Sequence, residues 1–200
     1  MSDETKVTLS AGELAMANDK NIILTKQAVT DKAFSLFGSM VPLITNEFEP
    51  ALNRHSKLSG AIPKIFKGEN YLGLPFVMMD YPAVFEKDNI FAVRTMFWWG
   101  NFISITIHLS GIHKKYWENS LLKKVAAQPD IFITVGQDEW QHHFEEDNYV
   151  AFSLLSTEQQ KNIKEKDFVK VSLKYELHHW NMMQSILPVG YKTIADLLLF

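Results

Sequence analysis

The stretch that most constrains the fold is residues 91–111, FAVRTMFWWGNFISITIHLSG, which hold the densest run of β-branched and aromatic residues in the chain. Such residues favour strands, and the pattern predicts two strands joined by a tight turn at Trp98-Trp99-Gly100. Gly100 suits this turn, because three-residue hairpin loops need a residue in the left-handed region. We therefore expect a β-hairpin at the centre of the fold.

The register of this hairpin follows from the hydrophobic pattern, because successive side chains of a strand point to opposite faces. A three-residue loop sets Thr95 opposite Ile103 and makes one face almost wholly apolar. A two-residue loop sets Arg94 opposite Ile105 and scatters the polar side chains. The pattern therefore predicts the three-residue loop.

The second face of the predicted hairpin gathers four hydrogen-bonding side chains among apolar neighbours: Arg94, Ser104, Thr106 and His108. With Trp98 at the turn they form a candidate ligand-binding site, because ligand pockets are mostly apolar with a few convergent polar groups. A guanidinium holds a carboxylate or phosphate, so the expected ligand is a small, partly apolar anion. Two structural alternatives stay open: the face is half solvated, or a structural carboxylate neutralises Arg94.

Length and composition limit the class of protein. The chain of 200 residues is 46% hydrophobic, which suits one globular domain. Its net charge of −3 disfavours nucleic acid as a partner. The absence of cysteine excludes disulfides, thiolate metal sites and cysteine nucleophiles. The polar N-terminus is not a signal peptide, and the uncharged stretch from Thr95 to His113 is strand-patterned rather than membrane-spanning. We therefore expect a cytoplasmic protein without a membrane partner.

The rest of the chain predicts an α+β domain over residues 1–200, in which a helical part at 1–55 packs on a largely antiparallel sheet within 71–178. Helices are expected at about 11–18, 30–46, 114–128, 156–164 and 194–200, with Pro42 and Pro50 bending or breaking the second. Further strands are expected at 76–79, 131–135, 149–154 and 168–178, with loops at 64–70, 82–89 and 136–148. The strand at 168–178 alternates so regularly that we expect one buried and one solvated face. Pro188-Val189-Gly190 is expected to break the C-terminal part of the chain.

Part of the chain resembles a known family. The carrying stretches are residues 88–100, DNIFAVRTMFWWG, the aromatic strand after them, Lys114-Lys115-Tyr116-Trp117, Pro129-Asp130-Ile131-Phe132, and the Glu158-Gln159 helix that leads into a strand. Their order resembles the YktB-like family of bacterial proteins of unknown function. The chain departs from it upstream, where Gly68-Glu69-Asn70-Tyr71 stands in place of an Arg-rich tract. The resemblance implies an α+β sheet with flanking helices and no particular activity.

Two histidine pairs are further candidates for chemistry. His142 and His143 lie in an acidic loop and could ligate a metal through imidazole and carboxylate. Adjacent histidines on an extended backbone point apart, however, so we expect a solvated loop and no bound metal. His178 and His179 end the strand at 168–178, and His179 is expected to be a satisfied core histidine.

These observations leave three functions open. No nucleophile elbow, phosphate-binding loop or dinucleotide fingerprint occurs in the sequence, so no cofactor is expected. The leading hypothesis is a domain that binds a small molecule on the hairpin face. The alternatives are an enzyme in which His108 acts as acid or base beside Arg94, and an interaction protein that uses exposed aromatic side chains. Oligomeric state and ligand identity are not predicted.

Overall fold

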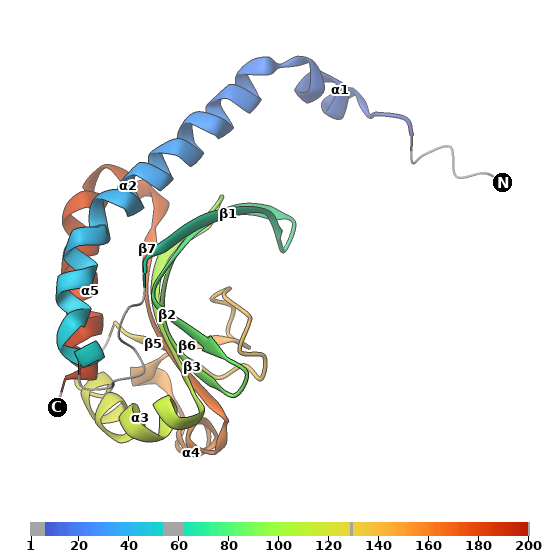
Figure 1. Cartoon of the computed structure of the whole chain (residues 1–200). Helices are drawn as coiled ribbons and strands as arrows, with labels where there is room; N and C mark the ends of the chain where they lie inside the picture. Colours follow the sequence, from blue (N-terminus) through green and yellow to red (C-terminus); the bar gives the residue numbers. More distant parts are fainter. Residues whose placement is uncertain (1–6, 54–61, 129, 200) are drawn as a thin grey trace.

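The fold is α+β, with helices on one face of a seven-stranded antiparallel sheet (Figure 1). The computed structural model describes residues 7–53, 62–128 and 130–199. The strand order is β1-β2-β3-β4-β7-β5-β6. The strands are β1 (Lys64–Tyr71), β2 (Leu74–Glu86), β3 (Asn89–Trp98), β4 (Phe102–Ser110), β5 (Phe132–Thr134), β6 (Tyr149–Ala151) and β7 (Phe168–Glu176). The predicted fold class is therefore confirmed.

Within the described ranges, five α-helices accompany the sheet: α1 (Ala11–Asn18), α2 (Lys20–Asn53), α3 (Gly111–Val125), α4 (Thr157–Glu165) and α5 (Met183–Leu198). Among them, α2, α3 and α5 lie along one side of the sheet in Figure 1. Serine side chains begin two helices, since Ser10 and Ser156 each form a capping box. Among the described residues, no helix is long and apolar enough to cross a membrane.

The largest hydrophobic core lies between the helices and the sheet. Odd-numbered side chains of the central hairpin, such as Phe91, Val93 and Ile105, are fully buried in it against the helices. Trp117 of α3 and Tyr191 of α5 are the largest side chains buried there. The apolar hairpin face predicted from the sequence therefore faces the helices, and the polar face lies on the opposite side of the sheet.

The predicted hairpin register is wrong by two positions, although each side chain keeps its predicted face. Thr95 lies opposite Ile105, and Arg94 lies opposite Thr106. The loop is still three residues long but spans residues 99–101, because Trp98 pairs with Phe102 instead of entering the turn. A shift of two keeps the alternation of faces, so the apolar pattern could not distinguish these two registers.

Two strand predictions are also corrected. Residues 64–70 are not a loop, because they form most of edge strand β1, whose outer side can carry polar residues. Residues 82–89 do not simply connect strands, because β2 continues to Glu86 through an irregularity between Asp80 and Ala83. Bulges of this kind allow proline within a strand.

The helices differ from the predictions mainly in extent. Neither Pro42 nor Pro50 ends α2, which runs for 34 residues, and Pro188 likewise lies inside α5. Proline costs a hydrogen bond and crowds the preceding turn, but apolar packing on the sheet compensates for this loss here. Thr30 is the first buried residue of α2, and the half-buried Val29 before it packs against the same core, so the helix packs on the body from about Val29 onward.

Candidate functional site

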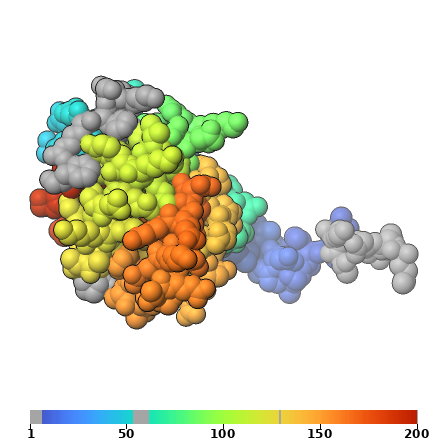
Figure 2. All heavy atoms as spheres, turned by 90° about the horizontal axis from the view of Figure 1, so that it is seen from below, coloured from blue at the N-terminus to red at the C-terminus, as the bar shows by residue number. Residues whose placement is uncertain are grey.

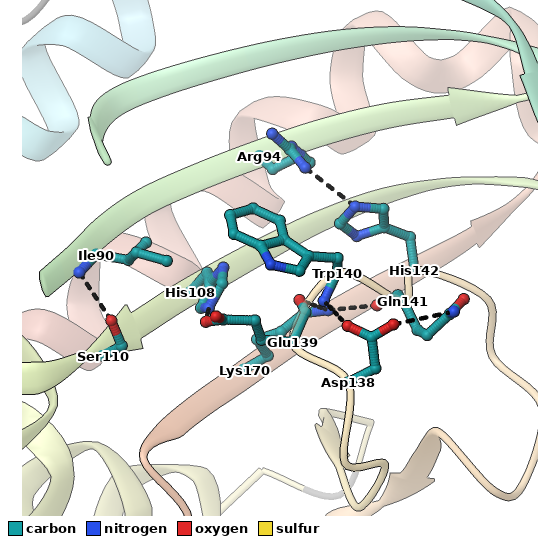
Figure 3. Close-up of polar contacts among 10 residues, drawn as sticks. All are labelled: Ile90, Arg94, His108, Ser110, Asp138, Glu139, Trp140, Gln141, His142 and Lys170. Atoms are coloured by element: carbon teal, nitrogen blue, oxygen red, sulfur yellow. Dashed lines mark hydrogen bonds and ion pairs between the residues drawn. The ribbon is translucent and has the colours of Figure 1, made fainter. Parts of the chain in front are cut away.

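The polar side of the sheet is covered by the loop at residues 136–148 rather than by helices. Side chains of β3, β4 and β7 point from the sheet toward this loop, as the close-up in Figure 3 shows for three of them. We call this region the covered face and define it by Arg94, Thr106, His108, Lys170 and Ser172. All but Arg94 are classed as buried. The strand predicted to have one solvated face therefore has both faces buried over Phe168–Ser172, because the loop excludes water there.

Arg94 is neutralised by Asp80, which lies directly opposite on β2. Its Nε donates to Oδ1 and its Nη2 to Oδ2, both over 2.8 Å. The side chains are only 15% and 6% exposed. Two parallel bonds of this kind are the strong form of an arginine–carboxylate pair. The structural alternative considered for Arg94 is thus the arrangement observed.

The third donor group of Arg94 reaches the covering loop. Its Nη1 lies 3.0 Å from Nε2 of His142 (Figure 3). Because arginine only donates, Nε2 must accept and the imidazole is neutral. Burial lowers the pKa of His142 well below its usual value, and the nearby cations Lys170 and Arg94 lower it further. His142 is therefore a fixed contact between loop and sheet.

His108 contacts Glu139 at the other end of the covered face. Its Nε2 lies 3.0 Å from Oε2 of Glu139. Burial lowers the pKa of His108 to about 3, with Lys170 and Arg94 adding to the effect. The neutral ring therefore donates Nε2–H to the carboxylate. Burial also raises the pKa of Glu139.

Lys170 is the most unusual group of the covered face, since it is a lysine with 0% exposure. It lies opposite His108 on the neighbouring strand. Its ammonium donates to the main-chain oxygen of Glu139 over 3.0 Å and to that of Gln141. Within the described ranges no carboxylate forms an ion pair with it. Burial lowers the pKa of Lys170 to about 7, with Arg94 adding to the effect.

The covering loop is held in place by several side chains. Tyr71 of β1 accepts hydrogen bonds from the main-chain amides of His142 and His143, over 2.6 and 3.1 Å. Asn148 donates to the main-chain oxygen of His143 over 2.6 Å. Asp138 accepts from the main-chain amide of Trp140 over 2.8 Å. The loop is therefore a structured cover rather than the solvated segment expected from its composition.

The five predicted ligand-binding residues share one side of the sheet but not one site. Thr106 shares a hydrogen bond of 2.8 Å with Ser172, beside Arg94 and His108. Trp98 lies near the hairpin turn, where it packs on Phe102 in a separate apolar cluster. Ser104 is buried between these two regions of β4. The structure thus brings three of the predicted residues into the covered face and leaves Trp98 and Ser104 beside it.

The histidine pairs do not form a metal centre in the part of the chain that the structure describes. His142 turns to Arg94, whereas Nδ1 of His143 accepts from the main-chain amide of Glu145 over 3.4 Å. No group of three histidine, aspartate or glutamate residues is arranged to hold a metal within the described residues. His178 and His179 lie in a 3-10 turn at the end of β7 rather than in the strand.

A cleft opens beside the His108 end of the covered face. Its volume is about 1060 Å³, and its wall includes Ser110, Phe168 and Glu139. Lys166 also lines it and donates to the main-chain oxygen of Gly136. Burial lowers the pKa of Lys166 to about 8. Because Glu139 both lines the cleft and contacts His108, its side chain separates the cleft from the covered face.

Sequence reasoning missed Asp80, Glu139 and Lys170. Lys170 lies between two valines in an alternating strand. Because lysine is rarely buried, this pattern predicted that the Lys170 side chain would point to solvent. The signal that could have identified it is its place opposite His108 on the polar side of the sheet. That pairing of β4 with β7 joins segments 62 positions apart, and nothing local in the sequence indicates it.

Comparisons with known proteins do not add a family to this geometry. Neither a family model, nor a curated protein, nor a solved structure matches the chain. The resemblance to the YktB-like family stays a hypothesis based on the order of elements.

Proposed function

We propose that the protein binds a small, partly apolar anion at the His108 end of the covered face. The single observation that carries this proposal is Lys170, a fully buried lysine held by two loop carbonyls. A buried ammonium without an anionic partner is costly. The carboxylates of Asp138 and Glu139 act on Lys170 only from a distance. An anion that reaches the ammonium would supply a directly paired counter-charge, and the pKa of about 7 means that the group can take up its proton on binding.

The route to Lys170 runs through the cleft. Glu139 is the side chain between the cleft and His108, and it is about one third exposed. A ligand carboxylate or phosphate that displaced this side chain would find the His108 Nε2–H and the Lys170 ammonium next to each other. The apolar part of the ligand would lie on Phe168 and Trp140, whose rings already pack on His108 at centroid distances of 6.0 and 5.7 Å.

Arg94 has a supporting part in this proposal. Its guanidinium is engaged by Asp80 and His142, so direct contact with the ligand belongs to Lys170 and His108. Arg94 instead fixes the loop through His142 and adds positive potential to the covered face. Thr106 and Ser172 complete the polar floor between the two cations.

A ligand screen with matched lysine variants tests the proposal. Thermal unfolding is measured with a panel of small carboxylates and phosphate esters, for the wild type, Lys170→Met and Lys174→Met. Lys174 lies four residues along the same strand and is 30% exposed in an ion pair with Glu176. We expect a panel member to stabilise the wild type and Lys174→Met but not Lys170→Met. Equal stabilisation of all three proteins would contradict the proposal.

A second candidate function is acid–base catalysis at His108. The observation that favours it is the carboxylate of Glu139 on Nε2, since a carboxylate commonly orients a catalytic imidazole. The depressed pKa keeps the His108 ring neutral near neutral pH, and because Nε2–H donates to Glu139, Nδ1 is the nitrogen that could accept a proton. Turnover of a ligand found in the screen, lost in His108→Gln while binding persists, would distinguish catalysis from binding alone.

A further inference from the structure

The N-terminal helical segment projects away from the rest of the molecule. Its ribbon in Figure 1 and its atoms in the space-filling view of Figure 2 extend well beyond the body that carries the sheet. We call residues 11–29 the arm; it comprises α1 and the first ten residues of α2. Every residue of α1 is exposed. In α2, Lys26 and Val29 are half-buried, and Thr30 is the first buried residue. The arm is interrupted at Asp19, whose backbone is extended, and its two helical parts together are roughly 27 Å long.

Large aliphatic side chains cover the arm. Leu14, Met16, Ile23 and Leu24 are between 53% and 60% exposed, and Ile22 is 39% exposed. Soluble proteins seldom expose apolar groups together over more than a few hundred Å², and larger patches mark interaction sites. Helical stability in proteins also comes mainly from packing of an apolar face. The arm therefore calls for a surface that covers it.

The charges of the arm are self-complementary. It carries two acids and two bases, in the order Glu13, Asp19, Lys20 and Lys26. If two arms run antiparallel around Asp19-Lys20, Glu13 of each copy faces the partner's Lys26, and Asp19 faces the partner's Lys20. In the same register Met16 faces the partner's Ile23. A surface patch that matches itself under a two-fold axis is the requirement for a symmetric dimer.

We propose that the arm is a dimerisation element that clasps the arm of a second copy of this chain. In each copy α1 packs antiparallel on the start of the partner's α2. Two such arms would bury on the order of 1,000 Å², the lower bound for a specific interface. The arm has no excess of basic residues, whereas helices that lie on membranes are rich in lysine and arginine. This composition favours a second copy over a lipid surface.

Sedimentation equilibrium of the full chain tests the proposal. We expect the wild type to have twice the chain mass of 23.0 kDa at micromolar concentration. The double variant Ile23→Gln/Leu24→Gln should dimerise at least about tenfold more weakly. The control variant Leu154→Gln/Val189→Gln removes two apolar side chains that are even more exposed but lie outside the arm, and it should dimerise like the wild type. Thermal unfolding should show that both variants fold.

Charge reversal tests the arrangement of the two arms. Lys26→Glu should weaken the dimer by placing a carboxylate against the partner's Glu13. Adding Glu13→Gln removes this repulsion and keeps the capping box at Ser10, so it should restore part of the affinity. Lys26 also contacts Glu69 of its own chain, so a loss that comes from this internal contact would not be restored. A monomeric wild type, a dimer unaffected by Ile23→Gln/Leu24→Gln, or a monomer that uses the arm to pellet with anionic lipid vesicles would each overturn the proposal.

Discussion

Removing one partner of the Asp80–Arg94 ion pair should strongly destabilise the covered face, because the remaining charge is left buried. The Arg94→Met variant keeps a stem of similar shape but leaves the Asp80 carboxylate in a site where its side chain is only 6% exposed. Breaking a buried pair in this way costs about 3–5 kcal/mol of unfolding free energy. The loss of the bond from Nη1 to His142 adds about 1 kcal/mol. Since each kcal/mol lowers the Tm of a domain of this size by about 2–4 °C, the expected decrease is roughly 10 °C or more.

A double-mutant cycle measured by urea unfolding isolates this contribution. Asp80→Leu and Arg94→Met should each be strongly destabilising, because each leaves one charge buried without its partner. The combined variant leaves neither charge and should recover most of the loss, since apolar groups often replace a buried pair at little net cost. Lys174→Met is the control, because its partly exposed pair with Glu176 should contribute at most about 1 kcal/mol. A loss below about 1 kcal/mol in Arg94→Met would refute the reasoning, since the pair would then behave like one at the surface.

Three further predictions concern Lys170 and the covering loop. Lys170 has a pKa of about 7 in the folded protein against 10.5 in the unfolded chain, so the unfolded state binds more protons between these values and stability should rise with pH there. The free energy of unfolding should rise by at most about 1.4 kcal/mol per pH unit from this group. Urea unfolding across this pH range should show a weaker pH dependence in Lys170→Met than in the wild type. Equal pH dependence in the two proteins would contradict the burial of the ammonium. Tyr71→Phe removes the acceptor of two loop amides, so hydrogen exchange at His142 and His143 should become about tenfold faster, and unchanged exchange would show that the loop is held by other contacts. Elemental analysis of the purified protein should find no stoichiometric zinc, nickel or iron, whereas about one ion per chain would point to the His142-His143 loop as a metal site.

The two faces of the central hairpin could be predicted from the sequence, but the register could not. Alternation of apolar and polar residues places Val93 and Arg94 on opposite faces of the hairpin. Shifting the strand pairing by an even number of residues does not change these faces. The register depends on whether Trp98 belongs to the turn or to the strand. Its packing on Phe102 and its hydrogen bond to Tyr71 place it in the strand, and the hydrogen bond depends on β1, most of which was predicted as a loop.

The candidate site could be predicted only in part, because half of it comes from a distant segment. Arg94, Thr106 and His108 lie on the hairpin and follow from its pattern. Glu139 and His142 come from a loop whose composition is typical of a solvated segment, and nothing in its sequence shows that it lies on the sheet. Once the loop covers the sheet, a lysine on the alternating strand β7 becomes fully buried, which contradicts the usual preference of lysine for solvent.

The most direct test of the covered face as an anion site is the titration of Lys170 itself. NMR of protein labelled at the lysine ε-carbons follows the ionisation of this group with and without a saturating anion from the ligand screen, and Lys170→Met assigns the signal. The free protein should titrate near pH 7. Because proton and anion binding are linked, an anion that binds the charged form tenfold more tightly than the neutral form raises the pKa by about one unit. A bound anion that leaves the Lys170 pKa unchanged would contradict the proposed site.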